Sequence, residues 1–450
     1  MLFSSLPDDT LLHLFDMVLS EHRRALLTKH PAYSTGNIPI AMKLSQIARS
    51  TRALVQNTPL LWTIVDAVVL KNPSHLTLHL KQSRQRLLDI LADIGAQDDD
   101  VFPKLILLLM QVHRWRRLRL CTTSKKDLLL ILASFKNLRL QKLQELHLSY
   151  KDGNEIYDYD DDGPLSACRI FQGGTPCLKK LHLADVAAFP CTISTLTHLH
   201  LYHAPFQFQS GLWTYSELTE MLSKMQCLRY LSMTGVVVNL IDIPAEGETA
   251  FSLPITLQSL KLITEDDEDQ FQEYREDGQG NPYITCVLSM LRDTHLTRLY
   301  LLRPTPSSLA PIIDDMRIDG LRFLHVTDLY WGAEIADEED ALTFIQAFPA
   351  VESLFFMGIT GKAILDVLVS SPNAGSLWQH LHTITLNQTT VTEARQVVES
   401  RINVDRPLQS LQMRMPKPKD QFSTLEWLSD HLKVSWVPEI YDKCIFYDTE

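Results

Sequence analysis

One short pattern of hydrophobic and polar positions, apolar-x-x-apolar-x-apolar, recurs eleven times between residues 115 and 413. The central apolar residues of the eleven copies are Leu118, Leu146, Leu181, Leu199, Leu231, Leu260, Leu299, Leu324, Leu354, Ile384 and Leu411. Their mean spacing is about 29 residues. Alternation of apolar and polar positions within each copy predicts a strand whose apolar side chains face one side. The strands are expected to be parallel, because every unit returns the chain to the same edge before the next strand begins.

The repeat length and the pattern resemble those of the leucine-rich repeat, which has one strand and one return element per unit. The sequence therefore predicts an α/β fold, a leucine-rich-repeat solenoid with a curved parallel sheet of about eleven strands. A stacked array also suits the length of 450 residues. Each unit buries its face against its neighbours, so no single large core is needed.

Residues 1–70 lack the repeat and predict a small all-helical module. A helix is expected to start at Pro7, with acidic residues in its first turn. One apolar face of this helix is predicted from spacing, and it comprises Leu11, Leu14, Phe15 and Val18. A second helix is expected near 41–56, and its inward residues are predicted to be Leu44, Ile47 and Ala48, with Leu54 and Val55 as further candidates.

The two ends of this module resemble the F-box found in many fungal proteins with irregular leucine-rich repeats. Leu6, Pro7, Asp9, Leu14 and Phe15 match the start of that family, and the stretch 58–64 (TPLLWTI) matches its Thr-Pro-x-Leu-Trp end. The stretch 47–52 departs from the family, because it keeps two arginines but has neither the usual Cys nor the usual Trp.

The resemblance implies a substrate-recognition subunit of a cullin-type ubiquitin ligase, in which the F-box helices bind a Skp-type adaptor and the repeats hold a protein substrate. By this resemblance Leu6, Pro7, Leu11, Leu14 and Phe15 would contact the adaptor. We then expect Leu14 and Phe15 to be solvent-accessible in the isolated chain. An alternative is a free-standing repeat scaffold whose N-terminal helices only cap the end of the solenoid.

These patterns divide the chain into four predicted parts. Residues 1–70 form the F-box-like module, and residues 71–114 form a helical linker that caps the solenoid. Residues 115–436 form the solenoid, and residues 437–450 form a C-terminal tail.

Polar residues on either side of each central apolar residue are expected to point onto the concave face of the sheet. The candidate substrate-binding residues among them are Arg117, Arg119, His147, Lys180, His182, His198, His200, Tyr230, Lys261, Arg298, Tyr300, Phe323 and His325. We expect Arg117, Arg119, Lys180, His182, His198 and His200 to form one positive patch. Tyr230, Arg298, Tyr300 and Phe323 have the composition of interface anchors. This composition favours an extended acidic or phosphorylated segment. The alternative is an ordinary solvated β face.

The net charge of −12 is concentrated in three acidic inserts, at 152–162, 265–277 and 334–340. The inserts are predicted to be solvated loops, with an acidic rim that repels anionic partners as the alternative. The remaining chain is mildly basic without clustered Lys and Arg, which disfavours nucleic-acid binding.

The sequence lacks the common catalytic and nucleotide-binding motifs. It has no P-loop, no HExxH and no GxSxG motif, so we expect a protein without catalytic activity or cofactors. Four histidines, His147, His182, His198 and His200, fall on neighbouring predicted strands, but a flat sheet does not suit tetrahedral zinc, and a pH-sensitive basic patch is favoured over a metal site.

Seven cysteines without a CxxC pair predict neither a disulfide framework nor a zinc finger. The first twenty residues do not resemble a signal peptide, and no apolar run is long enough to cross a bilayer. A cytoplasmic or nuclear protein is therefore expected, without membrane or nucleic-acid partners.

Overall fold

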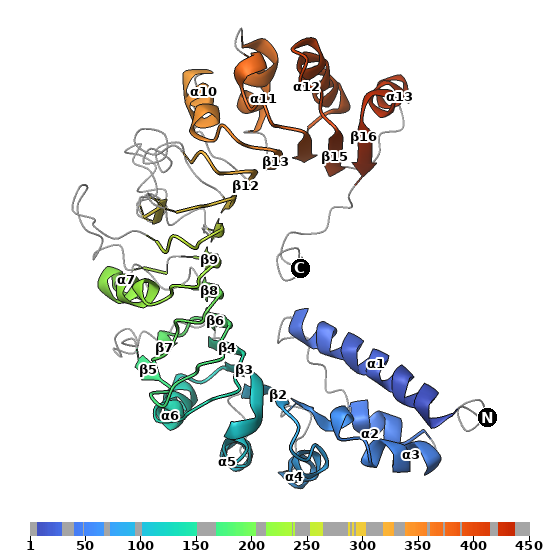
Figure 1. Ribbon diagram of the computed structural model, residues 1–450, viewed down its shortest axis with the longest axis vertical. Helices are drawn as coiled ribbons and strands as arrows, with labels where there is room; N and C mark the ends of the chain where they lie inside the picture. Colours follow the sequence, from blue (N-terminus) through green and yellow to red (C-terminus); the bar gives the residue numbers. More distant parts are fainter. Residues whose placement is uncertain are drawn as a thin grey trace. The chain divides into compact units, whose positions relative to one another are not determined.

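The computed structural model shows a mixed α/β chain dominated by parallel strands (Figure 1). It describes residues 7–28, 40–47, 49–66, 73–94, 101–150, 168–203, 213–235, 237–238, 253–263, 287–288, 290–291, 294–302, 318–327, 338–357, 361–371, 374–387, 389–414 and 422–436. The chain divides into two compact units. The first contains residues 1–197 and 443–450, and the second contains residues 198–442.

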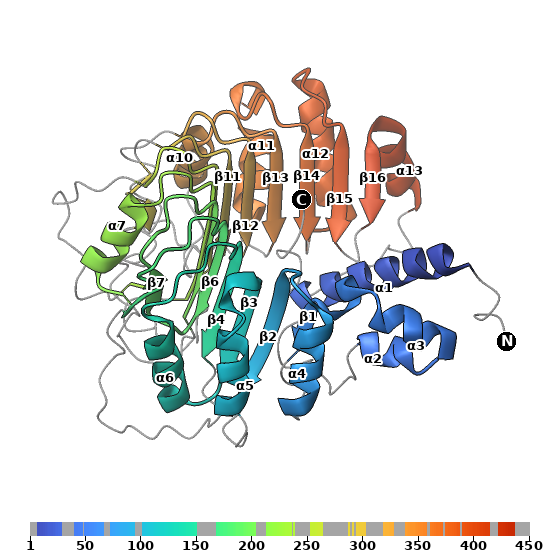
Figure 2. The ribbon, with the colours of Figure 1, turned by 60° about the horizontal axis from the view of Figure 1, so that its bottom comes forward.

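The first unit combines N-terminal helices with a parallel sheet in the order β1-β2-β3-β4-β6. Its helices are α1 (Asp8–Thr28), α2 (Ile40–Ser45), α3 (Arg49–Gln56), α4 (Pro73–Gln82), α5 (Val101–Leu109) and α6 (Lys125–Phe135), with short 3-10 turns at Pro59–Trp62 and Val112–Arg114. Its sheet strands are β1 (Ile64–Asp66), β2 (Leu88–Ile94), β3 (Trp115–Thr122), β4 (Glu145–Tyr150) and β6 (Lys180–Ala184). A separate two-stranded sheet pairs β5 (Cys168–Ile170) with β7 (Ala188–Pro190). Helices α4, α5 and α6 lie along one side of β1–β4 (Figures 1 and 2).

The N-terminal helices share a core of their own, and the phase of α1 differs from the prediction. Leu11, Phe15 and Leu19 of α1 are buried in this core, whose other members are Ala41, Val55, Leu61, Trp62 and Ile64. Phe15 is only 3% exposed, so the expectation that it is solvent-accessible was wrong. Leu14 is 37% exposed, as expected. The buried stripe follows i, i+4, i+8 spacing, because these are the residues that the later helices cover.

The second predicted helix is broken into two short ones. Helix α2 ends at Ser45 and α3 begins at Arg49, so Ile47 lies between them and is 47% exposed. Its predicted inward position was therefore wrong, whereas Val55 is fully buried and Leu44 and Leu54 pack against the same core. Ala48 lies outside the described residues.

Residues 71–114 are not purely helical. Between α4 and α5 the chain forms β2, which pairs in parallel with both β1 and β3. Leu88, Ile90 and Ala92 on this strand are buried. The prediction of a helical linker was wrong at this point, because the apolar residues at 88, 90, 92 and 94 alternate with Asp89, Leu91 and Asp93, which is the period of a strand.

The described residues of the second unit form a parallel sheet of nine strands in sequence order. Its strands are β8 (His198–Tyr202), β9 (Tyr230–Thr234), β10 (Ser259–Ile263), β11 (Arg298–Leu302), β12 (Phe323–Thr327), β13 (Ser353–Met357), β14 (Thr383–Asn387), β15 (Ser410–Arg414) and β16 (Lys433–Trp436). The helices in the described part of this unit are α7 (Tyr215–Ser223), α10 (Glu338–Ala347), α11 (Gly361–Ser370), α12 (Val391–Asn403) and α13 (Phe422–His431), with a 3-10 turn at Ala374–Ser376. Figure 2 shows α11, α12 and α13 on one side of β13–β16.

All eleven copies of the apolar pattern form strands, three in the first unit and eight in the second. Every central residue from Leu118 to Leu411 is at most 3% exposed. Neighbouring strands within each unit pair in parallel, and their central residues lie opposite one another, as in Leu299 opposite Leu324. The prediction of buried central residues on adjacent parallel strands is confirmed within each unit.

Main-chain hydrogen bonds repeat with the same period just before the strands of the second unit. The amide of Thr297 donates to Gln258 O, that of Arg322 to Thr297 O, and that of Glu352 to Arg322 O, at 2.8–3.0 Å. Helices α7 and α12 each begin with a capping box, formed by Thr214 with Glu217 and by Thr390 with Glu393. The inter-strand bonds hold the strands in register, and the two capping boxes fix where α7 and α12 begin. Among the residues described, no helix has the length and apolar character that crossing a membrane requires.

Candidate functional site

The outward residues of the strands form an open face in each unit, on the side of the sheet opposite the buried leucines. In the first unit we define the first open face as Arg117, Arg119, Glu145, His147, Lys180 and His182. In the second unit we define the second open face as His198, His200, Tyr230, Ser232, Ser259, Lys261, Arg298, Tyr300, Phe323, His325, Ser353, Phe355, Thr383, Thr385, Ser410, Gln412, Lys433 and Ser435. The six residues of the predicted positive patch divide between these faces, four in the first and two in the second.

Two arginines at the first open face, Arg117 and the adjacent Arg116, each face a carboxylate of the protein. Arg117 Nε lies 3.0 Å from Glu145 Oε2 on the adjacent strand. Next to it, Arg116 holds the nearly buried carboxylate of Asp89 with two hydrogen bonds of 2.8 and 2.5 Å. The Asp89 hydrogen bond raises the pKa of Arg116. Arg117, a member of the predicted positive patch, therefore has its charge opposed by Glu145, and the patch as a whole stays a prediction.

Two histidines of the first open face stack on each other. The rings of His147 and His182 are 4.0 Å apart and nearly parallel, because the two residues lie opposite each other on β4 and β6. Burial of the His182 imidazole, together with the positive charge of Arg119, lowers its pKa to about 4. His182 is consequently neutral at pH 7, and its predicted contribution to a positive patch was wrong. Lys180 is exposed at the edge of this face.

The second open face carries a continuous aromatic cluster over β11, β12 and β13. The ring centroids of Tyr300 and Phe323 are 5.2 Å apart, and those of Tyr300 and His325 are 5.5 Å apart. His325 stacks on Phe355 at 3.8 Å. Further along the face, His198 stacks on Tyr230 at 4.3 Å. Strand register produces these contacts, because Tyr300, His325 and Phe355 are direct neighbours in one row across the sheet.

The members of this aromatic cluster differ in solvent exposure. His325 and Phe355 are 7% and 5% exposed, whereas Tyr300 and Phe323 are half-buried. Burial raises the pKa of Tyr300. His325 was expected as an accessible contact residue, but its neighbours in the row cover it. Phe355 was not among the predicted site residues, although it occupies the outward position next to His325 in the apolar pattern and could have been found by aligning the copies.

Carboxylates are absent from the second open face as defined. None of its residues is Asp or Glu, although the whole chain has 54 acidic residues among 450. Arg298 is exposed on this face, and none of the ion pairs between described residues uses it. Lys261 is half-buried on the neighbouring strand, one row away. The described part of this face therefore has a positive electrostatic bias beside an aromatic surface.

A different apolar surface lies on α1. Leu14, Met17 and Val18 are 37%, 57% and 44% exposed, and their i, i+3, i+4 spacing places them on one stripe of the helix. Of the other predicted adaptor contacts, Pro7 is exposed and Leu11 is buried. Leu6 lies outside the described residues, as do the acidic inserts at 152–162 and 265–277 and most of the insert at 334–340.

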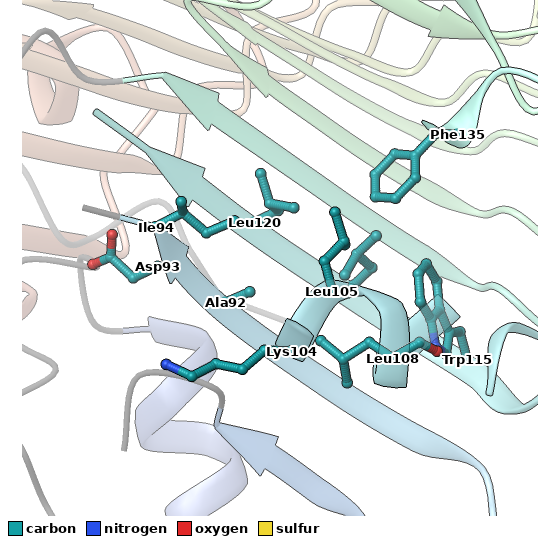
Figure 3. Close-up of a pocket in the computed structure, with 10 residues that line it drawn as sticks. Ala92, Asp93, Ile94, Lys104, Leu105, Leu108, Trp115, Leu120 and Phe135 are labelled. Carbon is teal, nitrogen blue, oxygen red and sulfur yellow. The ribbon is translucent and has the colours of Figure 1, made fainter. Parts of the chain in front are cut away.

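A small cavity lies inside the first unit, between β2, β3 and the helices α5 and α6. Its volume is about 20 Å³, which is room for one water molecule. Figure 3 shows Leu105 and Leu108 of α5 facing Trp115, with Phe135 nearby and Lys104 extending away from them. The lining is mainly apolar, and the volume is far below that of a ligand site. Among the described residues, no group of three His, Cys, Asp or Glu side chains is arranged to hold a metal ion.

Comparison of the chain with protein-family models and with curated proteins found no match.

Proposed function

We propose that this protein is a substrate-recognition subunit of a cullin-type ubiquitin ligase. In this proposal α1, α2 and α3 form an F-box-like module that binds a Skp-type adaptor. The repeated strands form a leucine-rich-repeat solenoid whose open faces bind a protein substrate. The protein acts by binding, without catalysis or cofactors of its own, in the cytoplasm or nucleus.

The observation that carries this proposal is the presence of two apolar stripes on α1. Leu11, Phe15 and Leu19 are buried in the core of the helical module. The second stripe, Leu14, Met17 and Val18, remains 37–57% exposed. A helix that served only as a packing element would need one apolar stripe, and a second one is typical of a surface that another protein covers.

Two further features support the proposal. The start and end of the module resemble the F-box at Pro7, Leu14 and the stretch 58–64. The Trp of that end, Trp62, is buried, and its indole nitrogen donates to Val55 O at 2.8 Å. The solenoid part is supported by the period of about 29 residues, with one parallel strand for each copy of the pattern.

Adaptor capture by the full chain tests the proposal. We expect the chain to co-purify with a Skp-type adaptor, and the double variant Leu14→Asp, Met17→Asp to lose at least about tenfold in adaptor affinity, because charge on this stripe cannot be buried against a partner. Its thermal unfolding should stay close to that of the wild type, since both side chains are exposed.

A matched control is available on α5. Ile106 of α5 and Met110, which directly follows this helix, are 59% and 68% exposed, so Ile106→Asp, Met110→Asp makes the same chemical change at another helix. This control should bind the adaptor as the wild type does. Equal binding by all three chains, or equal loss in both variants, would refute the adaptor surface on α1.

A free-standing repeat scaffold is the second candidate function. The core of the helical module includes Ile64 of β1, and Leu91 of β2 packs against it, so the module is continuous with the sheet of its own unit. A cap over the end of a repeat array has this arrangement. Failure of the wild-type chain to bind any Skp-type adaptor, together with strong destabilisation by Phe15→Asp, would favour the scaffold.

A further inference from the structure

The second open face presents aromatic and cationic side chains in a fixed order across neighbouring strands. Ser259, Arg298, Phe323 and Ser353 form one row, and Lys261, Tyr300, His325 and Phe355 form the next. Adjacent strands are spaced by about 4.8 Å. The distance from β10 to β13 is therefore about 14 Å, which an extended peptide covers with about four residues.

The aromatic part of these rows includes two nearly buried side chains, His325 and Phe355. His325 and Phe355 are nearly buried and stack at 3.8 Å, so they form a base that cannot readily change its rotamers. Phe323 and Tyr300 rest against this base at its exposed edge, at 5.2 Å from each other. Rigid aromatic side chains lose little conformational entropy on binding, which is why they serve as anchors in protein interfaces.

The charge beside this aromatic surface has one sign. Arg298 is the direct neighbour of Phe323 in its row, and Lys261 is the direct neighbour of Tyr300. The second open face as defined contains no Asp or Glu, and Arg298 forms no ion pair among the residues that the structure describes. Arg298 offers two parallel N–H donors, which suit the two oxygens of a carboxylate.

We propose that Arg298, Tyr300 and Phe323, supported by His325 and Phe355, form an anchor site for an acidic peptide segment of another protein. One apolar or aromatic side chain of the segment packs on Phe323 and Tyr300, and a carboxylate one or two residues away pairs with Arg298. The inference deepens the proposed function and rests on it in one respect, namely that the open face of the repeats receives the substrate.

Fluorescence anisotropy with the full chain and a labelled probe peptide tests the anchor site. The probe has a central Phe flanked on both sides by Asp and Glu. We expect it to bind the wild type, and to bind Arg298→Glu at least about tenfold more weakly, because like charges then face each other. Replacing the central Phe of the probe by Ala should weaken binding by a similar factor. Binding should also weaken as salt rises.

Lys433 supplies the matched control, since it is exposed, occupies the same row as Arg298 and lies on β16, five strands away. Lys433→Glu changes the net charge of the chain by the same amount, and we expect binding within about twofold of the wild type, because the two sites are further apart than the screening length. Equal weakening by both variants would mean that net charge alone attracts the probe, and the anchor site would be refuted. An equal affinity for the Phe and Ala versions of the probe would refute the anchor site as well.

Two further outcomes are decisive. A wild-type chain that is folded by circular dichroism but does not bind the carboxylate probe would overturn the inference, and so would binding of only a phosphoserine version of the probe. Adaptor capture is measured on the same Arg298→Glu chain. Loss of probe binding with intact adaptor capture supports the inference, whereas a wild type that binds the probe but no adaptor would refute the ligase function and leave the anchor site standing.

Discussion

The open faces of the two units have the same repeated pattern, but they differ in whether their arginines have carboxylate partners within the protein. On the first, Arg117 faces Glu145, and the neighbouring Arg116 holds Asp89, so each of these arginines has a carboxylate partner within the protein. On the second, aromatic side chains replace the carboxylates, and Arg298 has no ion-pair partner among the described residues. Ionic contacts that stabilise a fold leave little charge for a ligand, whereas unopposed charge beside aromatic rings favours binding. The second face is therefore the better candidate for recognition.

The first prediction concerns Phe355, where we expect the largest effect. Replacing Phe355 with Ala removes a side chain that is 5% exposed and stacked on His325, and should lower the free energy of unfolding by about 3 kcal/mol. His147→Ala removes the corresponding half-buried partner of the histidine stack in the first unit and should cost about 1 kcal/mol. Urea denaturation of both variants measures the difference. Equal costs would mean that the two stacks contribute alike and that Phe355 is not a structural base.

The second prediction concerns the ion pair of the first unit. Asp89→Ala leaves the guanidinium of Arg116, which is 26% exposed, without its carboxylate, and should destabilise the fold by about 2 kcal/mol. Arg298→Ala in the second unit should change the free energy of unfolding by less than about 0.5 kcal/mol, since it breaks no ion pair between described residues. Thermal and chemical denaturation compare the two variants. A large loss from Arg298→Ala would show that this arginine is structural, and would weaken its assignment as a ligand contact.

The strands of both faces were predictable from the sequence, and the side chains that distinguish them were predictable only in part. A pattern repeated eleven times fixes which residues are buried and which are opposite one another, because parallel strands in register align equivalent positions. Glu145 and Arg117 hold the same position in consecutive copies, so their pairing follows from the pattern, whereas the burial of His325 and Phe355 became clear only from the structure. Strand β2 carries the same spacing at Leu87, Ile90 and Ala92, and it was missed because this copy ends in a small residue.

Helix α1 shows a different limit of prediction from sequence, which concerns the apolar stripe that is buried. Leu11, Leu14, Phe15, Val18 and Leu19 include two overlapping apolar stripes, and spacing alone does not say which of them the neighbouring helices will cover. The structure covers Leu11, Phe15 and Leu19. The break between α2 and α3 similarly ends the helical phase, so Ile47 does not continue the inward face that the residues before it predict. In both cases tertiary packing decides which apolar residues are buried, and the local sequence pattern alone does not.

The third and smallest predicted effect is a dependence of stability on pH that resides in the first unit. The pKa of His182 in the folded protein is about 4, below its usual value of 6.5, because burial and Arg119 disfavour the charged imidazole. Between pH 4 and 6.5 the unfolded chain therefore binds a proton that the folded chain does not. The contribution of this group to stability is complete above about pH 6.5 and is lost as pH falls toward 4. His79, buried beneath Trp62, has the same shift and the same sign.

His182→Gln removes the titrating ring, so the decrease in the midpoint of thermal unfolding between pH 7 and pH 5 should become smaller than in the wild type. The matched comparison is Arg119→Gln, which keeps the imidazole but removes the neighbouring positive charge. This variant should raise the pKa of His182 toward its usual value and should also reduce the acid sensitivity, though less than His182→Gln does, because burial is the larger cause of the shift. An unchanged pH profile in both variants would show that His182 titrates alike in the folded and unfolded chains. The histidine stack of the first face would then be accessible enough to carry charge, and the contrast between the two faces would be smaller than the geometry indicates.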